Sequence, residues 1–163
     1  MPRYATVLVV LLVPGLLVGA GCARAARDTT GFAVQEETTV QAPFEDAWQT
    51  VKGVLREQGY DIYTRDKRGA FVAYTDAHRV LWTQPHRIKY TIDLTPVSDT
   101  ETAVRVEAVR QIYGVTLLTY PGWHDRRLTK NEGAVALLAA VREKLSAPAA
   151  PEKPEVVEAA GAV

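Results

Sequence analysis

Several residue types that carry protein chemistry are scarce in this chain of 163 residues. It has one cysteine, so no intramolecular disulfide and no cysteine-built zinc site can form. Its 19 basic and 19 acidic side chains cancel, which argues against a general nucleic-acid binder because such proteins need an excess of positive charge. The phosphate-binding spacings GxGxxG and GxxxxGK(S/T), the zinc-protease spacing HExxH and the nucleophile elbow GxSxG are missing. We therefore expect no enzyme activity, no cofactor and no metal.

The longest apolar run is also short. Residues 7–18 form an apolar run of 12 positions, and a membrane-spanning helix needs roughly 20. Arg3 precedes this run, and the small residues Gly19, Ala20 and Gly21 follow it. A positive start, an apolar middle and a small-residue end are typical of a secretory signal. We predict that residues 1–21 are a signal peptide.

The predicted signal leads directly into Cys22, the only thiol in the chain. The sequence GAGC over residues 19–22 resembles the lipobox of bacterial lipoproteins, which ends in a small residue and the lipidated cysteine. The resemblance implies cleavage before Cys22, acylation of its sulfur and new amino group, and a lipid anchor in the cell envelope. Position 23 is alanine, not the aspartate that keeps enteric lipoproteins in the inner membrane, so the resemblance favours the periplasmic face of the outer membrane. The alternative is a plain secretory signal followed by an incidental cysteine.

The composition divides the rest of the chain into three parts. Residues 22–31 are small and polar, and we expect them to form a tether. Residues 32–147 hold the sustained hydrophobic periodicity, and their 116 positions suffice for one core. Residues 148–163 contain three prolines and few bulky side chains, so we predict a disordered tail.

Hydrophobic periodicity predicts the elements of residues 32–147. Alternation over 32–41 predicts a strand with Val34, Glu36, Thr38 and Val40 on one face. A helix is predicted from Pro43 to Gly59, and its apolar stripe comprises Phe44, Ala47, Trp48, Val51, Val54 and Leu55. Strands are predicted over 60–64, 70–75, 87–94 and 102–113, and the charged turn 65–69 joins the first two.

A final helix is predicted over 124–145, with an apolar face made of Leu128, Val135, Leu138, Val141 and Leu145. The order is strand, helix, four strands, helix. We predict an α+β fold in which a single antiparallel sheet packs on a long C-terminal helix and carries its helices on one side.

The segment AWQTVKGVLREQGYDIYTRDKRGAFVAY over residues 47–74 suggests a family. A tryptophan early in the helix, a Gly-aromatic exit and a strand entering a charged turn resemble the helix-grip modules of the C-subunit lipoprotein of the outer-membrane barrel-assembly machinery. The resemblance implies a helix-grip-like domain, a membrane-tethered position and an accessory or scaffolding role.

Two groups of side chains are candidates for a site. His78 and His86 flank one loop and, with Asp76, are either a metal site or, as we favour, structural or solvated groups. Trp82, Tyr120 and Trp123 are predicted in connections, where they either rim a pocket or a partner-binding patch or continue the last strand under the C-terminal helix. Two basic clusters, Arg65/Lys67/Arg68 and Arg126/Arg127, are either solvated or contact anionic headgroups or a partner's acidic face.

These observations favour a membrane-anchored, non-enzymatic envelope lipoprotein that binds another protein or acts as a scaffold. Its expected partners are the membrane, through lipidated Cys22, and an envelope protein, with no nucleic acid. The alternative is a carrier of a lipid or other apolar ligand in a cavity between the sheet and the C-terminal helix. A filled space between those layers favours the scaffold.

Overall fold

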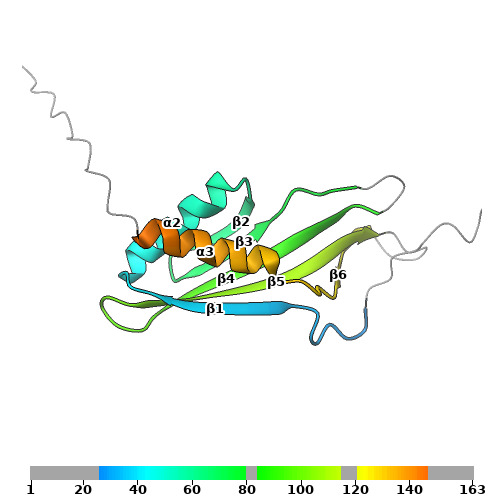
Figure 1. The fold of residues 1–163 in the computed structure, drawn as a ribbon. Helices are drawn as coiled ribbons and strands as arrows, with labels where there is room; N and C mark the ends of the chain where they lie inside the picture. The colour runs from blue at the N-terminus through cyan, green and yellow to red at the C-terminus, as the bar shows by residue number, and fades with distance from the viewer. Residues whose placement is uncertain (1–25, 80–83, 115–120, 147–163) are drawn as a thin grey trace, which may run out of the picture.

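The computed structural model describes residues 26–79, 84–114 and 121–146. They form one sheet of six antiparallel strands with two helices on one face (Figure 1). The predicted α+β class and the single antiparallel sheet are confirmed. The predicted signal peptide, Cys22 and the predicted tail over 148–163 lie outside the described residues. Neither helix in the described ranges is long and apolar enough to cross a membrane.

The strand order follows from antiparallel pairing between neighbours. The path across the sheet is β1 (Val34–Val40), β5 (Thr102–Gly114), β4 (His86–Pro96), β3 (Ala70–Tyr74) and β2 (Asp61–Asp66). The 13-residue β5 is nearly twice as long as β1, so part of its edge extends beyond that strand. A sixth strand, β6 (Gly122–Arg126), pairs with this free part of β5.

The helix α2 (Phe44–Glu57) follows the sequence prediction closely. Pro43 stands at its N-cap, and Glu45 and Asp46 lie in the first turn, where carboxylates suit the helix dipole. Gly59 ends the segment with φ of +75°, a left-handed conformation that favours glycine. The predicted stripe is confirmed, because α2 buries Ala47, Trp48, Val51, Val54 and Leu55 against the sheet.

One face of the sheet supplies the other half of the core. Residues directly opposite in antiparallel strands share a face, so each core row can be followed across the strands. The row through Val106, Ile92 and Phe71 is entirely buried, and each of these side chains is 0% exposed. The next row, Val34, Ala108, Tyr90 and Ala73, is the last row that contains fully buried side chains on this face. Beyond it, Ile88 is only partly buried.

The C-terminal prediction was wrong at its start. The predicted helix over 124–145 begins later, as α3 (Glu132–Ser146), and residues 122–126 are β6. The free edge of β5 explains the difference, because pairing satisfies backbone groups of β6 that a helix would otherwise satisfy internally. The sheet therefore has one strand more than predicted.

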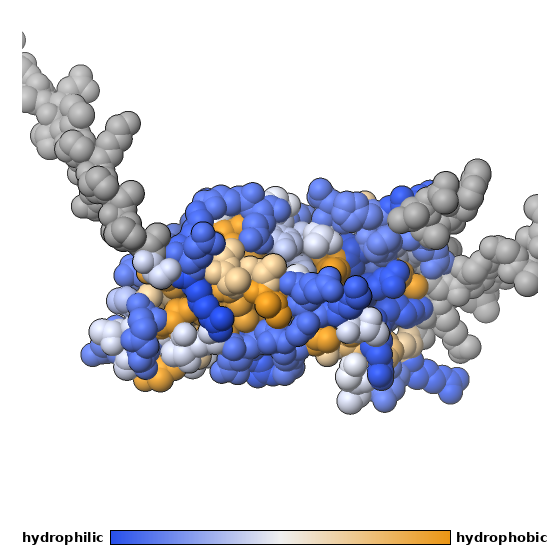
Figure 2. Space-filling model, viewed as in Figure 1, coloured by the Kyte–Doolittle hydropathy of each residue, from blue (hydrophilic) through white to orange (hydrophobic). Residues whose placement is uncertain are grey.

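The buried face of α3 also differs from the predicted one. Ala134, Leu137, Leu138 and Val141 are buried, whereas Val135 is 47% exposed. Leu128 precedes the helix, and its backbone N–H donates to the Phe32 carbonyl. Figure 2 shows apolar surface along the outer side of α3, where Val135, Ala136 and Ala139 are exposed.

Candidate functional site

The sheet is longer than the core beneath its helices. We call the end where β1 and β4 begin and β5 finishes the tether end, because the chain enters β1 there (Figure 1). The opposite end, where β4 leads into the turn 97–101, is the far end. At the tether end, β4, β5 and β6 continue past the last row of the sheet that is fully buried beneath the helices.

A row of aromatic rings around one arginine occupies the face that the helices do not cover. Arg87 lies between two rings, with its guanidinium carbon 3.8 Å from the centroid of Tyr74 and 4.1 Å from that of Trp123. Tyr63 meets Tyr74 edge-on at 6.2 Å, and Tyr113 meets Trp123 edge-on at 5.4 Å. These five residues, which we call the Arg87 ladder, come from five different strands.

Hydrogen bonds hold the ladder in place from below. Arg87 Nε donates to Gln111 Oε1 at 2.9 Å, and Gln111 Nε2 donates to Asp125 Oδ1 at 2.8 Å. Gln111 is only 8% exposed although neither helix packs on its face of the sheet. Each cation–π contact is worth about 0.5–1 kcal/mol at an exposed site, so two contacts and a hydrogen bond make Arg87 well ordered.

The ladder leaves two rings open to a partner. Tyr63 is 78% exposed and Tyr113 is 37% exposed. The arrangement combines rigid aromatic surface with one positive charge. Trp, Tyr and Arg are the residue types enriched at the energetic centres of protein interfaces.

The structure describes one of the three residues of the predicted aromatic patch. Trp123 belongs to the ladder, but it lies in β6 and not in a connection as predicted. Trp82 and Tyr120 lie outside the described residues. The sequence pattern missed Arg87, Tyr74 and Tyr113 as site residues. They belong to three different predicted strands, and only the register of the sheet brings them into contact.

The two histidines that flank one loop lie close together in the structure. His78 and His86 exchange backbone hydrogen bonds of 2.9 Å, and their ring centroids lie 6.4 Å apart. Ile112 stands opposite both His86 and His124, which places the three histidines in one row across the sheet. Within the described ranges, no group of three or more His, Cys, Asp or Glu side chains is arranged to hold a metal ion.

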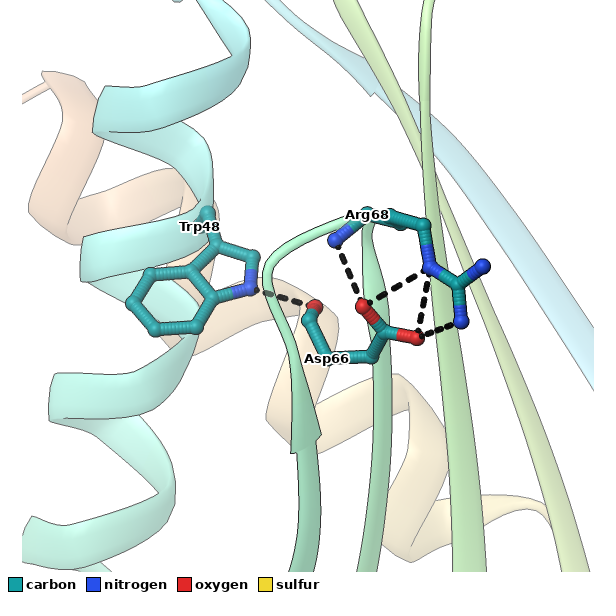
Figure 3. A network of polar contacts seen from close by, with 3 residues as sticks. All are labelled: Trp48, Asp66 and Arg68. Carbon is teal, nitrogen blue, oxygen red and sulfur yellow. Dashed lines mark hydrogen bonds and ion pairs between the residues drawn. The ribbon is translucent and has the colours of Figure 1, made fainter.

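Trp48 is a core residue, as its position in the predicted stripe indicates. Its ring packs against Phe71 at 5.2 Å, and its Nε1–H donates to the Asp66 carbonyl at 3.0 Å (Figure 3). In the same turn, Arg68 folds back on the Asp66 carboxylate through its backbone N–H and its guanidinium. The side-chain and backbone hydrogen bonds from Arg68 lower the pKa of Asp66. This part of the basic cluster Arg65/Lys67/Arg68 therefore stabilises the hairpin turn.

Tyr90 is the most perturbed ionisable group in the described core. It is 2% exposed, and burial, followed by the charge and hydrogen bond of Tyr60, raises its pKa. The Tyr60 ring meets it edge-on at 5.3 Å. Tyr90 seats the start of α3 on the sheet, because Gly133 lies directly over its hydroxyl.

The space between the sheet and the helices is filled by side chains. Phe71, Leu55, Ile92 and Leu137 are among the largest fully buried residues, and each is at most 1% exposed. A groove of about 190 Å³ lies between the end of β1 and the end of α3, below the roughly 300–1,000 Å³ of typical ligand pockets.

Comparison with known proteins finds structural similarity without an activity. No protein-family model matches the chain, and no curated protein matches it. A conserved protein of unknown function from Enterococcus faecalis is 14% identical, with 76% of this chain and 77% of that chain covered and a TM-score of 0.39. A TBP-like protein from Parabacteroides distasonis is 10% identical, with 72% and 96% covered and a TM-score of 0.41. A conserved protein from Geobacillus kaustophilus is 12% identical, with 69% and 94% covered and a TM-score of 0.37.

Proposed function

We propose that this protein is a non-enzymatic lipoprotein of the bacterial envelope, whose α+β domain binds another protein or acts as a scaffold. The proposed anchor is acylated Cys22, and the favoured location is the periplasmic face of the outer membrane. The tether over residues 22–31 would hold the domain close to the bilayer. The proposal assigns the domain a binding role and gives it no catalytic residue.

Two features support the anchor. The apolar run over residues 7–18 ends in GAGC, and the cysteine of that sequence is the only thiol in the chain. A single acyl chain binds a membrane only marginally, whereas two or more hold a protein stably, at about 0.8 kcal/mol for each buried methylene. Acylation of both the sulfur and the amino group of Cys22 would therefore suffice without a membrane-spanning helix.

The observation that carries the binding role is the Arg87 ladder on the uncovered face of the sheet. Its arginine is held in place by the sheet, since Arg87 donates to Gln111, which in turn donates to Asp125. Each aromatic side chain of the ladder rotates about at most two bonds and lies on a sheet. Binding a partner would therefore cost little side-chain entropy. An ordered aromatic surface with exposed Tyr63 at one end suits recognition of a folded partner.

The fold detail is compatible with the proposed helix-grip-like arrangement. Both helices pack on one face of the antiparallel sheet (Figure 1). Trp48 of α2 reaches the charged hairpin turn through its indole N–H. These features support the resemblance to the C-subunit lipoprotein and, with it, an accessory role in the envelope.

The anchor is tested by the intact mass of protein extracted from membranes. We expect a chain that begins at Cys22 and carries added acyl chains, and a Cys22→Ala variant without them. A membrane-extracted protein with a free, unmodified thiol would refute the anchor.

The binding role is tested by placing a photo-crosslinking residue at Tyr63 in intact envelopes. Ala139, on the exposed side of α3, is the matched control position on the opposite face. We expect a discrete protein adduct from position 63 that is lost when Arg87→Ala removes the centre of the ladder. Equal adducts from positions 63 and 139, or none from position 63, would contradict the proposed surface.

A further inference from the structure

The two ends of the domain are joined to different parts of the chain. The Phe32 carbonyl accepts a hydrogen bond of 2.8 Å from Leu128, which fixes the start of β1 beside the segment that follows β6. The chain therefore enters the domain at the tether end. The last turn of α3 lies at the far end, where Leu145 and Ser146 line a groove with Val40 (Figure 1). Whatever anchors the N-terminus holds the tether end nearest to the anchor.

Charge is distributed unevenly between these two ends. The chain as a whole has equal numbers of basic and acidic side chains. At the tether end, from the row of Lys89 and Val109 outward, the described residues carry twice as many cations as carboxylates. Arg27 and Asp28, just before β1, add one charge of each sign. The cations are Arg79, Arg87, Lys89, Arg110, Arg126 and Arg127, and the carboxylates are Asp61, Asp76 and Asp125.

The structure separates the two basic clusters of the sequence. Arg126 and Arg127 lie at the tether end, where β6 pairs with β5. The cluster Arg65/Lys67/Arg68 lies at the far end, because its turn is level with Asp93 near the end of β4. Arg68 is also neutralised there by its ion pair with Asp66. Only the cluster at the tether end therefore stands next to a proposed membrane anchor.

We propose that the tether end is a docking surface for anionic phospholipid headgroups, and that it orients the domain upright on the bilayer. The inference rests on the proposed lipid anchor at Cys22. Ten residue steps from Cys22 to Phe32 reach at most about 35 Å, so the anchor keeps the surface within range of the headgroups. Because the anchor makes the encounter intramolecular, a weak attraction is enough to set the orientation.

Side-chain chemistry at the tether end fits the interface of a bilayer. Arg79, Arg110 and Arg127 are exposed and positive, and such groups are attracted to a negative membrane surface. Tyr113 and Trp123 lie at the same end of the sheet, and Tyr and Trp are the aromatic residues enriched at headgroup level. The face of the sheet that carries Tyr63 would then remain accessible to a partner beside the membrane.

The test uses the lipidated protein in vesicles, with a fluorescent thiol probe at one of two positions. Ala77→Cys places the probe at the tether end and Ser98→Cys places it at the far end, and both sites are exposed. Acylated Cys22 cannot react, so the introduced thiol is the only one labelled. Contact is read from quenching by a lipid that carries a nitroxide on its headgroup, in vesicles of phosphatidylcholine with or without phosphatidylglycerol.

On vesicles with phosphatidylglycerol, we expect quenching at position 77 to exceed that at position 98 at least about twofold. High salt should remove the difference, because it screens exposed charges. Reversal of Arg110 and Arg127 to glutamate should also remove it. Reversal of Arg65 and Lys67, which changes the net charge equally at the far end, should leave it intact.

Three results would each refute part of the reasoning, and they can be told apart. If the protein floats with the vesicles but positions 77 and 98 are quenched equally, the docking surface is refuted, the anchor stands, and the cations are left for an acidic partner protein. If quenching at position 77 is the same on neutral vesicles, the tether alone brings that end close and the charge-based proposal fails. If the purified protein does not float at all, the anchor is refuted, and the docking proposal falls with it.

Discussion

Replacement of Gly133 by alanine tests how tightly α3 is seated on the sheet. Gly133 is the second residue of α3, and a Cβ atom there would lie under 3.0 Å from the Tyr90 hydroxyl oxygen and 3.3 Å from Cζ. The hydroxyl cannot swing aside easily, because Tyr90 is 2% exposed and its ring packs against Tyr60. Either the ring or the helix must therefore move.

The expected effect is the difference between two opposing contributions. Alanine is better than glycine in a helix by at most about 1 kcal/mol. Overpacking in a filled core costs typically about 1–3 kcal/mol. We expect Gly133→Ala to lower the free energy of unfolding by about 1–2 kcal/mol, measured by urea denaturation followed by circular dichroism.

A second substitution identifies the cause. Tyr90→Phe removes the oxygen atom that overlaps the new methyl group, and the nearest remaining atom is Cζ at 3.3 Å. Gly133→Ala should therefore cost much less in the Tyr90→Phe background, with a coupling of about 1–3 kcal/mol between the two sites. Gly53→Ala is the matched control, since nothing lies within 4 Å of a Cβ atom there, and it should stabilise α2 by about 0.5–1 kcal/mol. A stable Gly133→Ala variant, or an equal loss in both backgrounds, would refute this account of how α3 is seated.

Two further predictions concern the hairpin and alkaline pH. Gly69 has φ of +114°, and a Cβ atom there would overlap the Leu94 carbonyl oxygen, so Gly69→Ala should destabilise the domain by at least about 2 kcal/mol in urea denaturation. A loss below about 0.5 kcal/mol would show that the turn relaxes freely. Because burial raises the pKa of Tyr90 above its usual value of 10.0, the folded state holds this proton more tightly than the unfolded state. The contribution of Tyr90 to the free energy of unfolding should be fully present below pH 10 and should fall as the pH rises above it. Between pH 9 and 11, the urea midpoint of Tyr90→Phe should therefore fall less than that of the unsubstituted protein.

Local patterns were sufficient where one element determines its own structure. The stripe of α2 follows from apolar residues at helical spacing, and the structure buries the predicted set, with Phe44 partly buried at its start. The hairpin turn follows from Gly69, whose positive φ few other residues adopt without strain. His78 and His86 approach each other because both flank the connection between β3 and β4. In each case the interacting residues are close in sequence, so local geometry restricts the outcome.

The start of α3 could not be read in the same way. Residues 122–126 have no strong strand pattern, and they form β6 because β5 extends past β1 and offers unpaired backbone groups. That opportunity depends on the relative lengths and the register of two other strands. The exposure of Val135 follows from the same change, since the helix begins at Glu132 and presents Leu137 and Leu138 to the core.

Hydrophobic periodicity was enough to predict the fold class, the single sheet, and α2 with its stripe, and the residues before Cys22 motivate the proposed anchor. Which distant residues meet depends on the folded arrangement of the strands. Arg87, Tyr74 and Trp123 are separated along the chain, and only strand order and register stack them. The same register places Arg79, Arg110 and Arg127 at one end of a chain that has no net charge. The physical reason is that periodicity assigns each side chain to a face, whereas its neighbours on that face are fixed by backbone pairing between strands.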